Sequence, residues 1–201
     1  RFRSPELVVD EMEYLSRKHG VKEIVMFDET FTIGKKRMRK FAEEVRRRNV
    51  KVKFNIRARV DTVDREVLTL LKQAGLRSIH MGVEAGTDRL LKIMNKQITR
   101  AQTEKAFRIA REVGIETRGY FMIGYYDATP EDIEETIRFA ADIGLDWASF
   151  SVATALPGTD LYDVAKERGY VEGDFWRQYT IDGGGDIPQL ETETFTAEQL
   201  R

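Results

Sequence analysis

A short unit that begins with glycine recurs along this chain and restricts the folds that the chain can adopt. In each copy a glycine suited to ending a helix precedes an apolar residue, about two polar residues and a short apolar run. Four copies begin at Gly20, Gly75, Gly114 and Gly144, and a fifth begins at Asn49. Asparagine also tolerates the left-handed conformation of a helix cap. Each copy therefore predicts the end of a helix followed by one strand.

Amphipathic helices are expected to follow these strands. Their expected positions are near residues 35–48, 63–74, 99–113, 130–143 and 159–168. Thr99 and Gln102 form the pattern of a capping box, and Thr129 stands before Pro130 at a helix start. Strands that alternate with helices at short spacing pair in parallel through right-handed crossovers. The sequence thus predicts an α/β fold with one parallel sheet.

Both ends of the chain indicate parts of further elements. A helix is expected from Ser4 and Pro5 to Gly20, and no strand precedes it, although α/β domains normally begin on a strand. Residues 180–188 are rich in glycine and predict a flexible connection. After them Thr196 begins another helical pattern. We therefore expect residues 1–179 to form one incomplete α/β domain, residues 180–201 to be a linker with the start of a helix, and the chain to belong to a longer protein.

The charge balance and the apolar content exclude several classes of partner. The 33 Lys and Arg residues and the 34 Asp and Glu residues nearly cancel. No net field therefore attracts nucleic acid or an acidic membrane. No apolar run approaches the length of about 18 residues that a membrane span needs, and no secretory signal is visible. These observations predict a cytoplasmic protein. The chain contains no cysteine, which excludes disulfides, thiolate metal sites and cysteine nucleophiles within these residues.

Charged residues and glycines gather where the expected strands end. Parallel strands deliver the loops that follow them to the same edge of a sheet. In chain order the notable residues at or near the five ends are Asp28, Glu29, Arg57, Arg59, Glu84, Gly86, Arg118, Gly124, Leu156 and Gly158. Arginines pair with carboxylates, and acids pair with ammonium groups or with the hydroxyls of a ribose. The pattern predicts a polar ligand that carries both kinds of group.

Glu84 is the first candidate for a ligand contact, because it ends an apolar strand and precedes a glycine and a helical run from Asp88 to Met94. An acid that caps the next helix is the simpler alternative. His80 is expected to alternate with the apolar side chains of its strand. It is then either a ligand contact or a hydrogen-bonded interior residue. Tyr120 either lines a substrate cavity or covers the core.

Six short motifs in a fixed order resemble those of radical S-adenosylmethionine (SAM) enzymes. They are Arg3-Ser-Pro-Glu6, Phe27-Asp-Glu-Thr-Phe31, Ala58-Arg-Val-Asp61, Gly82-Val-Glu-Ala-Gly86 with Met94-Asn-Lys96, Phe121-Met-Ile-Gly124, and Leu156-Pro-Gly-Thr159. The resemblance covers residues 3–165 and is closest to the branch that often carries an upstream cobalamin-binding domain. It implies that residues 1–179 form an incomplete parallel (β/α)6 barrel of the TIM type that lacks its first strand. It further implies that SAM lies above a [4Fe-4S] cluster at the carboxyl ends of the strands.

The resemblance also implies roles for individual residues. Asp28 and Glu29 occupy the place of a motif that meets the methionine amino group, although they lack its two glycines. Arg57 and Arg59 lie where polar groups of SAM can be contacted, and Glu84 stands where the family contacts the ribose hydroxyls.

The remaining assignments concern the two ends of the SAM molecule. Lys96 or Arg118 is expected to reach the SAM carboxylate. Gly124 and Leu156 are expected to let the backbone approach the adenine.

The family motif Cys-x3-Cys-x2-Cys is absent from this chain. Three thiolates hold the cluster, and no other residue type here supplies such soft ligands. We therefore expect a core-domain fragment of a radical SAM enzyme that is inactive alone. Its parent protein is expected to act on a small-molecule substrate with an electron donor, and the open barrel edge can promote self-association. Two alternatives remain open: a non-catalytic binding module, and a cluster-free barrel enzyme that binds a sugar or a phosphate.

The absence of cysteine yields the first testable prediction. After anaerobic reconstitution with iron and sulfide, the purified chain should remain colourless and contain no iron after desalting, because it offers no thiolate. Metal analysis and visible absorbance measure this. An iron–sulfur chromophore that survives desalting would contradict the prediction.

Overall fold

A computed structural model describes residues 2–171, 175–181, 190–196 and 198–200. Of the glycine-rich connection expected at residues 180–188, residues 182–188 lie outside the described residues, and residues 180 and 181 are helical instead, at the end of α8 (Phe175–Ile181). Thr196 and Gln199, at the expected start of a last helix, make both hydrogen bonds of a capping box, and residues 198–200 form a turn.

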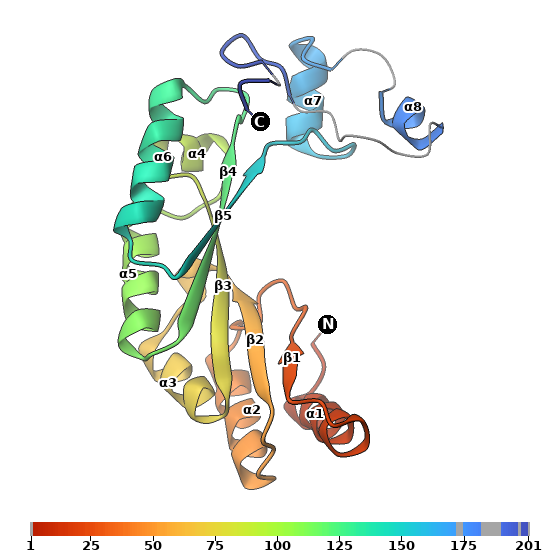
Figure 1. Cartoon of the computed structure of the whole chain (residues 1–201), viewed down its shortest axis with the longest axis vertical. Helices are drawn as coiled ribbons and strands as arrows, with labels where there is room; N and C mark the ends of the chain where they lie inside the picture. The colour runs from red at the N-terminus through yellow and green to blue at the C-terminus, as the bar shows by residue number, and fades with distance from the viewer. Residues whose placement is uncertain (1, 172–174, 182–189, 197, 201) are drawn as a thin grey trace. The chain divides into compact units, whose positions relative to one another are not determined.

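Five strands form one parallel sheet in the order β1-β2-β3-β4-β5 (Figure 1). They are β1 Glu23–Val25, β2 Lys53–Ala58, β3 Leu76–Glu84, β4 Glu116–Ile123 and β5 Trp147–Val152. Glu23 pairs with Lys53, and Arg57 pairs with His80. Every glycine-led or asparagine-led repeat has produced one strand, which confirms the predicted sheet. The edge position of β1 is also as expected.

The helices confirm the pattern of the sequence to within two residues at each expected end. They are α1 Pro5–His19, α2 Lys35–Arg47, α3 Arg65–Gln73, α4 Asp88–Ile93, α5 Arg100–Glu112, α6 Pro130–Asp142, α7 Asp160–Glu167 and α8 Phe175–Ile181, with a 3-10 turn η1 at Val60–Thr62. Thr99 and Gln102 form the predicted capping box, and Ser4 caps α1. Helix α8 was not predicted. None of the described helices is long and apolar enough to cross a membrane.

The residues group into two compact units. Unit 1 comprises Arg1–Val83, Ile98–Tyr120 and Ala140–Ser149, and unit 2 comprises Glu84–Gln97, Phe121–Phe139 and Phe150–Arg201. Each unit therefore combines stretches that are distant in the sequence.

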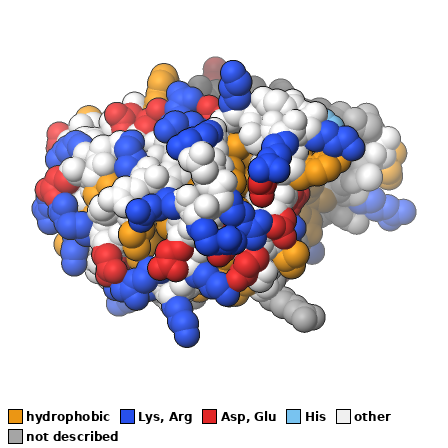
Figure 2. Space-filling view, turned by 90° about the horizontal axis from the view of Figure 1, so that it is seen from below, with side chains coloured by type: hydrophobic (Ala, Val, Ile, Leu, Met, Phe, Trp, Pro, Cys, Tyr) orange, Lys and Arg blue, Asp and Glu red, His pale blue; other side chains and the backbone are white. Residues whose placement is uncertain are grey.

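In unit 1, one face of the sheet is apolar and the other is polar. Helices α2, α3 and α5 cover one side of the sheet (Figure 1). The strand residues Phe54, Ile56 and Ile79 are at most 1% exposed. Their neighbours in the strands, among them Arg57 and His80, are half-buried on the opposite face. Because side chains alternate along a strand, consecutive residues of one strand belong in turn to the apolar core and to this polar face. On the outer surface, Figure 2 shows basic and acidic side chains interspersed, as the balanced composition predicts.

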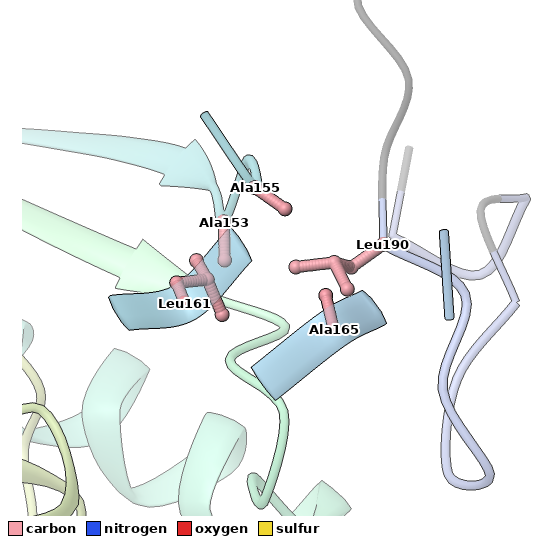
Figure 3. Packing of buried hydrophobic residues seen from close by; sticks show 5 residues of the cluster. All are labelled: Ala153, Ala155, Leu161, Ala165 and Leu190. Atoms are coloured by element: carbon pink, nitrogen blue, oxygen red, sulfur yellow. The ribbon is translucent and has the colours of Figure 1, made fainter. Parts of the chain in front are cut away.

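Unit 2 has a small core of its own (Figure 3). It consists of Ala153, Ala155, Leu161, Ala165 and Leu190, and Tyr125, Tyr126 and Tyr162 pack against it. Trp176 of α8 donates its indole N–H to the carbonyl of Ala155 at 2.8 Å. The segment after β5 is thereby tied to α7 and α8 by both apolar and polar contacts.

Asp132 joins the amino ends of α4 and α6 within unit 2. Its carboxylate accepts hydrogen bonds from the backbone N–H of Thr129 at 3.0 Å and from the hydroxyl of Thr87, the N-cap of α4, at 3.0 Å. It also forms an ion pair with Arg89. Burial alone would raise the pKa of this carboxyl, but the hydrogen bonds from Arg89, Thr129 and Thr87 outweigh it and lower the pKa. Asp132 is therefore ionised in the folded chain at pH values where an unfolded chain begins to protonate.

This junction predicts a pH-dependent stability. A carboxyl whose pKa is lowered by folding stabilises the fold above its unfolded pKa, and the contribution is lost as the pH falls through the folded value. Asp132→Asn should therefore cost about 2 kcal/mol at pH 7 and progressively less toward pH 3. Urea unfolding followed by circular dichroism at several pH values measures this. Glu134→Gln, an exposed position in the same helix, is the control and should shift the curve little. Parallel pH profiles for Asp132→Asn and the unmodified chain would refute the role of Asp132.

Candidate functional site

Glu84 has an unusual backbone conformation at the end of β3. Its φ is 70°, in the left-handed region that non-glycine residues rarely adopt. Such a conformation costs on the order of 1 kcal/mol or more and persists only where the surrounding structure imposes it. Strain of this kind is concentrated at ligand sites. It redirects the chain where the strand ends and sets the direction of the Glu84 side chain.

Lys96 is the partner of Glu84. Its ammonium donates a hydrogen bond to Glu84 Oε1 at 2.6 Å, and each side chain is 22% exposed. Asn95 and Gln97, on either side of Lys96, have φ values of 49° and 57°. The loop after α4 is therefore bent at two non-glycine residues around the lysine that meets Glu84. The sequence motifs assign these two residues to different parts of one ligand and do not predict their ion pair.

Gly86 anchors the same strand end to α6. Its N–H donates to Thr136 Oγ1 at 3.0 Å. A Cβ at this position would lie 2.6 Å from Thr136 Cα and 2.8 Å from the carbonyl oxygen of Glu135. Only glycine permits so close an approach. The backbone two residues after Glu84 is therefore fixed against α6.

Gly124 and Leu156 lie elsewhere in unit 2. Gly124 follows β4 with a φ of 72°, and a Cβ there would lie 2.6 Å from Leu200 Cδ1. The space beside this glycine is therefore filled by a leucine of the C-terminal segment. Leu156 is half-exposed, and its carbonyl accepts a hydrogen bond from the Thr159 hydroxyl at 2.7 Å.

The acids and arginines after β1 and β2 belong to unit 1. Asp28 and Glu29 are exposed in the segment that follows β1. Arg57 lies with its guanidinium 4.8 Å from the ring centre of Phe27. Arg59 donates from Nε and from a terminal nitrogen to the two oxygens of Asp61, both at 3.0 Å. Arg59 is thus held by a carboxylate of its own loop.

A chain of hydrogen bonds crosses the polar face of unit 1. Asn55 of β2 donates to Glu23 of β1 at 2.9 Å, and Ser78 of β3 donates to Asn55 at 2.7 Å. His80 contacts the Ser78 hydroxyl through Nε2 at 3.2 Å and the Tyr120 hydroxyl through Nδ1 at 3.0 Å. His80 is therefore a hydrogen-bonded residue of the polar face, and four strands are linked by side chains alone.

Two arginines stand beside this chain on the same face. Arg57 is the registry partner of His80 in β2, and Arg118 precedes Tyr120 by two residues in β4. Arg118 lies over the ring of Trp147 at 5.9 Å. The pKa of His80 is lowered, first by its burial and then by repulsion from Arg118 and Arg57, which Glu116 only partly offsets.

The predicted site residues are divided between the two units. Unit 1 contains Asp28, Glu29, Arg57, Arg59 and Arg118, whereas unit 2 contains Glu84, Lys96, Gly124 and Leu156. Within these groups the structure brings Glu84 and Lys96 into direct contact. The convergence of all nine around one ligand stays a prediction.

The donor set of the chain does not fit an iron–sulfur cluster. The sequence has no cysteine, and the described residues include no group of three His, Asp or Glu side chains that could hold a metal ion. The set does offer carboxylate oxygens, an ammonium and guanidinium groups, which suit the polar groups of a small organic ligand.

Comparison with known proteins identifies relatives of the whole chain. The chain is 33% identical over its full length to an uncharacterized methyltransferase of Pyrococcus horikoshii and covers 43% of that protein. It is 38% identical over 172 residues to an anaerobic magnesium-protoporphyrin IX monomethyl ester cyclase of Cereibacter sphaeroides, covering 84% of this chain and 28% of the cyclase. The chain therefore spans less than half the length of these relatives.

A solved structure and a family match agree with these relatives. The radical SAM methyltransferase TsrM of Kitasatospora setae, solved with cobalamin and a [4Fe-4S] cluster bound, superposes with a TM-score of 0.73 at 26% identity, covering 85% of this chain and 35% of TsrM. The fold is accordingly the incomplete parallel α/β barrel that was expected. Residues 1–140 match the radical SAM superfamily, and because this match covers well over half of the sequence, the chain belongs to that superfamily.

Proposed function

We propose that this chain is the SAM-binding core of a radical SAM enzyme, in which Glu84 binds the ribose of SAM. The observation that carries the proposal is the strained left-handed Glu84, held by Lys96 at the end of β3. A carboxylate is a good acceptor for the hydroxyls of a ribose. Membership of the superfamily identifies SAM as the ligand to test.

The ion pair supports this role because it leaves acceptor capacity on Glu84. Lys96 engages Oε1, and Oε2 accepts no hydrogen bond from the described residues. The hydrogen bond from the lysine restricts the rotation of the carboxylate, so that Oε2 is positioned for a ligand hydroxyl. Lys96 thereby takes the role of a positioning residue, in place of the carboxylate contact expected from the sequence.

The remaining SAM contacts follow the sequence motifs. We assign the methionine amino group to Asp28 and Glu29, because both acids are exposed after β1 and so accessible to an ammonium group. The adenine is assigned to the backbone near Gly124 and Leu156. For it to bind there, Leu200 would have to move from its place against Gly124.

The chemistry of the whole enzyme needs groups that this chain does not hold. A [4Fe-4S] cluster would supply the electron for SAM cleavage, and its cysteines must come from outside these 201 residues. We further propose a small-molecule substrate, an external electron donor and a cytoplasmic location for that enzyme. A cobalamin cofactor, as in TsrM, is also proposed.

The role of Glu84 can be tested by direct binding. In a longer protein that includes the cluster cysteines, Glu84→Gln should weaken SAM binding about tenfold, or about 1.4 kcal/mol. The reason is that the amide loses both the charge and the ion pair with Lys96. Equilibrium dialysis with labelled SAM measures the affinity, and the visible absorbance of the cluster should be unchanged.

Glu134→Gln is the matched control, since it makes the same acid-to-amide change at an exposed position of α6. It should bind SAM as the unmodified protein does. Unchanged SAM affinity in Glu84→Gln would remove Glu84 from the site, and an altered cluster spectrum would instead indicate a structural role.

A further inference from the structure

The polar face of unit 1 carries two positive charges, those of Arg57 and Arg118. Arg57 and Arg118 are half-buried there, and neither forms an ion pair with a described carboxylate. The nearby acids are engaged elsewhere: Glu23 accepts from Asn55 and Arg77, and Glu116 lies 3.8 Å from Arg77. Aromatic rings support both guanidinium groups but do not cancel their charge.

The hydrogen-bond chain beside them has a fixed direction. The Glu23 carboxylate can only accept, so Asn55 must donate its amide nitrogen to it and accept from Ser78 through its oxygen. The single Ser78 hydrogen is used in that bond, and Ser78 must therefore accept from Nε2–H of His80. In the neutral imidazole Nδ1 is then an acceptor, and the Tyr120 hydroxyl donates to it.

This arrangement is set to change when His80 gains a proton. The charged imidazole donates from both nitrogens. The Tyr120 oxygen then accepts from Nδ1–H, and its own hydrogen becomes available to another group. Repulsion from Arg57 and Arg118 opposes this state in the free chain, as the lowered pKa of His80 indicates. A negative group beside His80, within the field of both arginines, would offset that repulsion.

We propose that Arg57, Arg118 and the Tyr120–His80 pair form a binding subsite for an oxyanion, a carboxylate or a phosphate, on the substrate of the enzyme. Two guanidinium groups and one hydroxyl are the donors that such a group prefers. The proposal rests on the proposed function only in calling the ligand a substrate.

The sequence motifs also imply SAM contacts for Arg57 and Arg118, but Arg118 and His80 differ in their place in the strands from Asp28, Glu29 and Glu84. Asp28, Glu29 and Glu84 lie at or just after strand ends. Arg118, by contrast, is the third residue of β4 and stands five residues before its end, and His80 stands four residues before the end of β3. Arg118 and His80 therefore lie within the sheet face, where a second molecule can bind, and Arg57, one residue before the end of β2, lies beside His80 in the strand register.

Histidine NMR offers a direct test, because the chain contains only two histidines, His19 and His80. Chain labelled with ¹⁵N-histidine is titrated with inorganic phosphate in one arm and with acetate in the other, at constant ionic strength set with chloride. We expect saturable shifts of the His80 nitrogens in at least one arm, with a rise in its pKa, and no shift of His19. The stronger arm identifies the kind of oxyanion.

Substitutions assign the shift to the two arginines. Arg57→Gln and Arg118→Gln should each weaken the anion affinity at least tenfold, whereas Arg108→Gln, on the exposed surface of α5, should leave it unchanged. If either glutamine variant unfolds, Arg57→Lys and Arg118→Lys keep the charge and the stem and should retain binding within about tenfold. Absence of a His80 shift, or equal shifts in all variants, would overturn the proposal.

A competition experiment distinguishes this subsite from the SAM site. SAM added to the phosphate-saturated chain should leave the His80 signals in place. Displacement of phosphate by SAM would show that the arginines bind the SAM carboxylate and would overturn the substrate assignment. Loss of SAM binding in Glu84→Gln with intact anion shifts would concern the proposed function alone.

Discussion

The two-residue alternation of the strands is the constraint on which unit 1 depends. Phe54 and Ile56 pack against helices, while Asn55 and Arg57 stand on the opposite face of the same strand. A shift of β2 by one residue would exchange these sets and bury a guanidinium against the helices, at a cost of several kcal/mol. The apolar core and the polar face therefore fix the same register, and the hydrogen-bond chain from Glu23 to Tyr120 is possible only in that register.

In unit 2 the corresponding constraint is close backbone packing. Gly86 touches the backbone of α6, and Asp132 ties the start of that helix to α4. Both contacts involve residues just after Glu84, namely Gly86 and Thr87, and they hold Glu84 in its left-handed conformation. Strain at Glu84, the proposed ribose contact, is thus balanced by packing of the residues that follow it.

The sequence predicted the elements well because their ends have strong chemical signals. Gly20, Gly75, Gly114 and Gly144 all have positive φ, and Asn49 has a φ of 53°, as their helix-ending role requires. The site was predicted less completely. Nothing in the residue type of Glu84 indicates a positive φ, and the contact with Lys96 joins positions twelve residues apart through a loop whose path the sequence does not specify. The pairing of Arg59 with Asp61 was easier to predict, since the two positions lie two apart in the sequence.

The carboxylate of Glu23 has an effect far from its own position. It is the one member of the hydrogen-bond chain that cannot donate, and it therefore removes the choice between two opposite proton arrangements in Asn55, Ser78, His80 and Tyr120. With a glutamine in its place, the four hydrogen bonds could run in either direction, and the imidazole would be distributed between two tautomers. An exposed acid on the edge strand thus determines which nitrogen of the His80 imidazole carries the proton. It does so through Asn55 and Ser78, without contacting the imidazole itself.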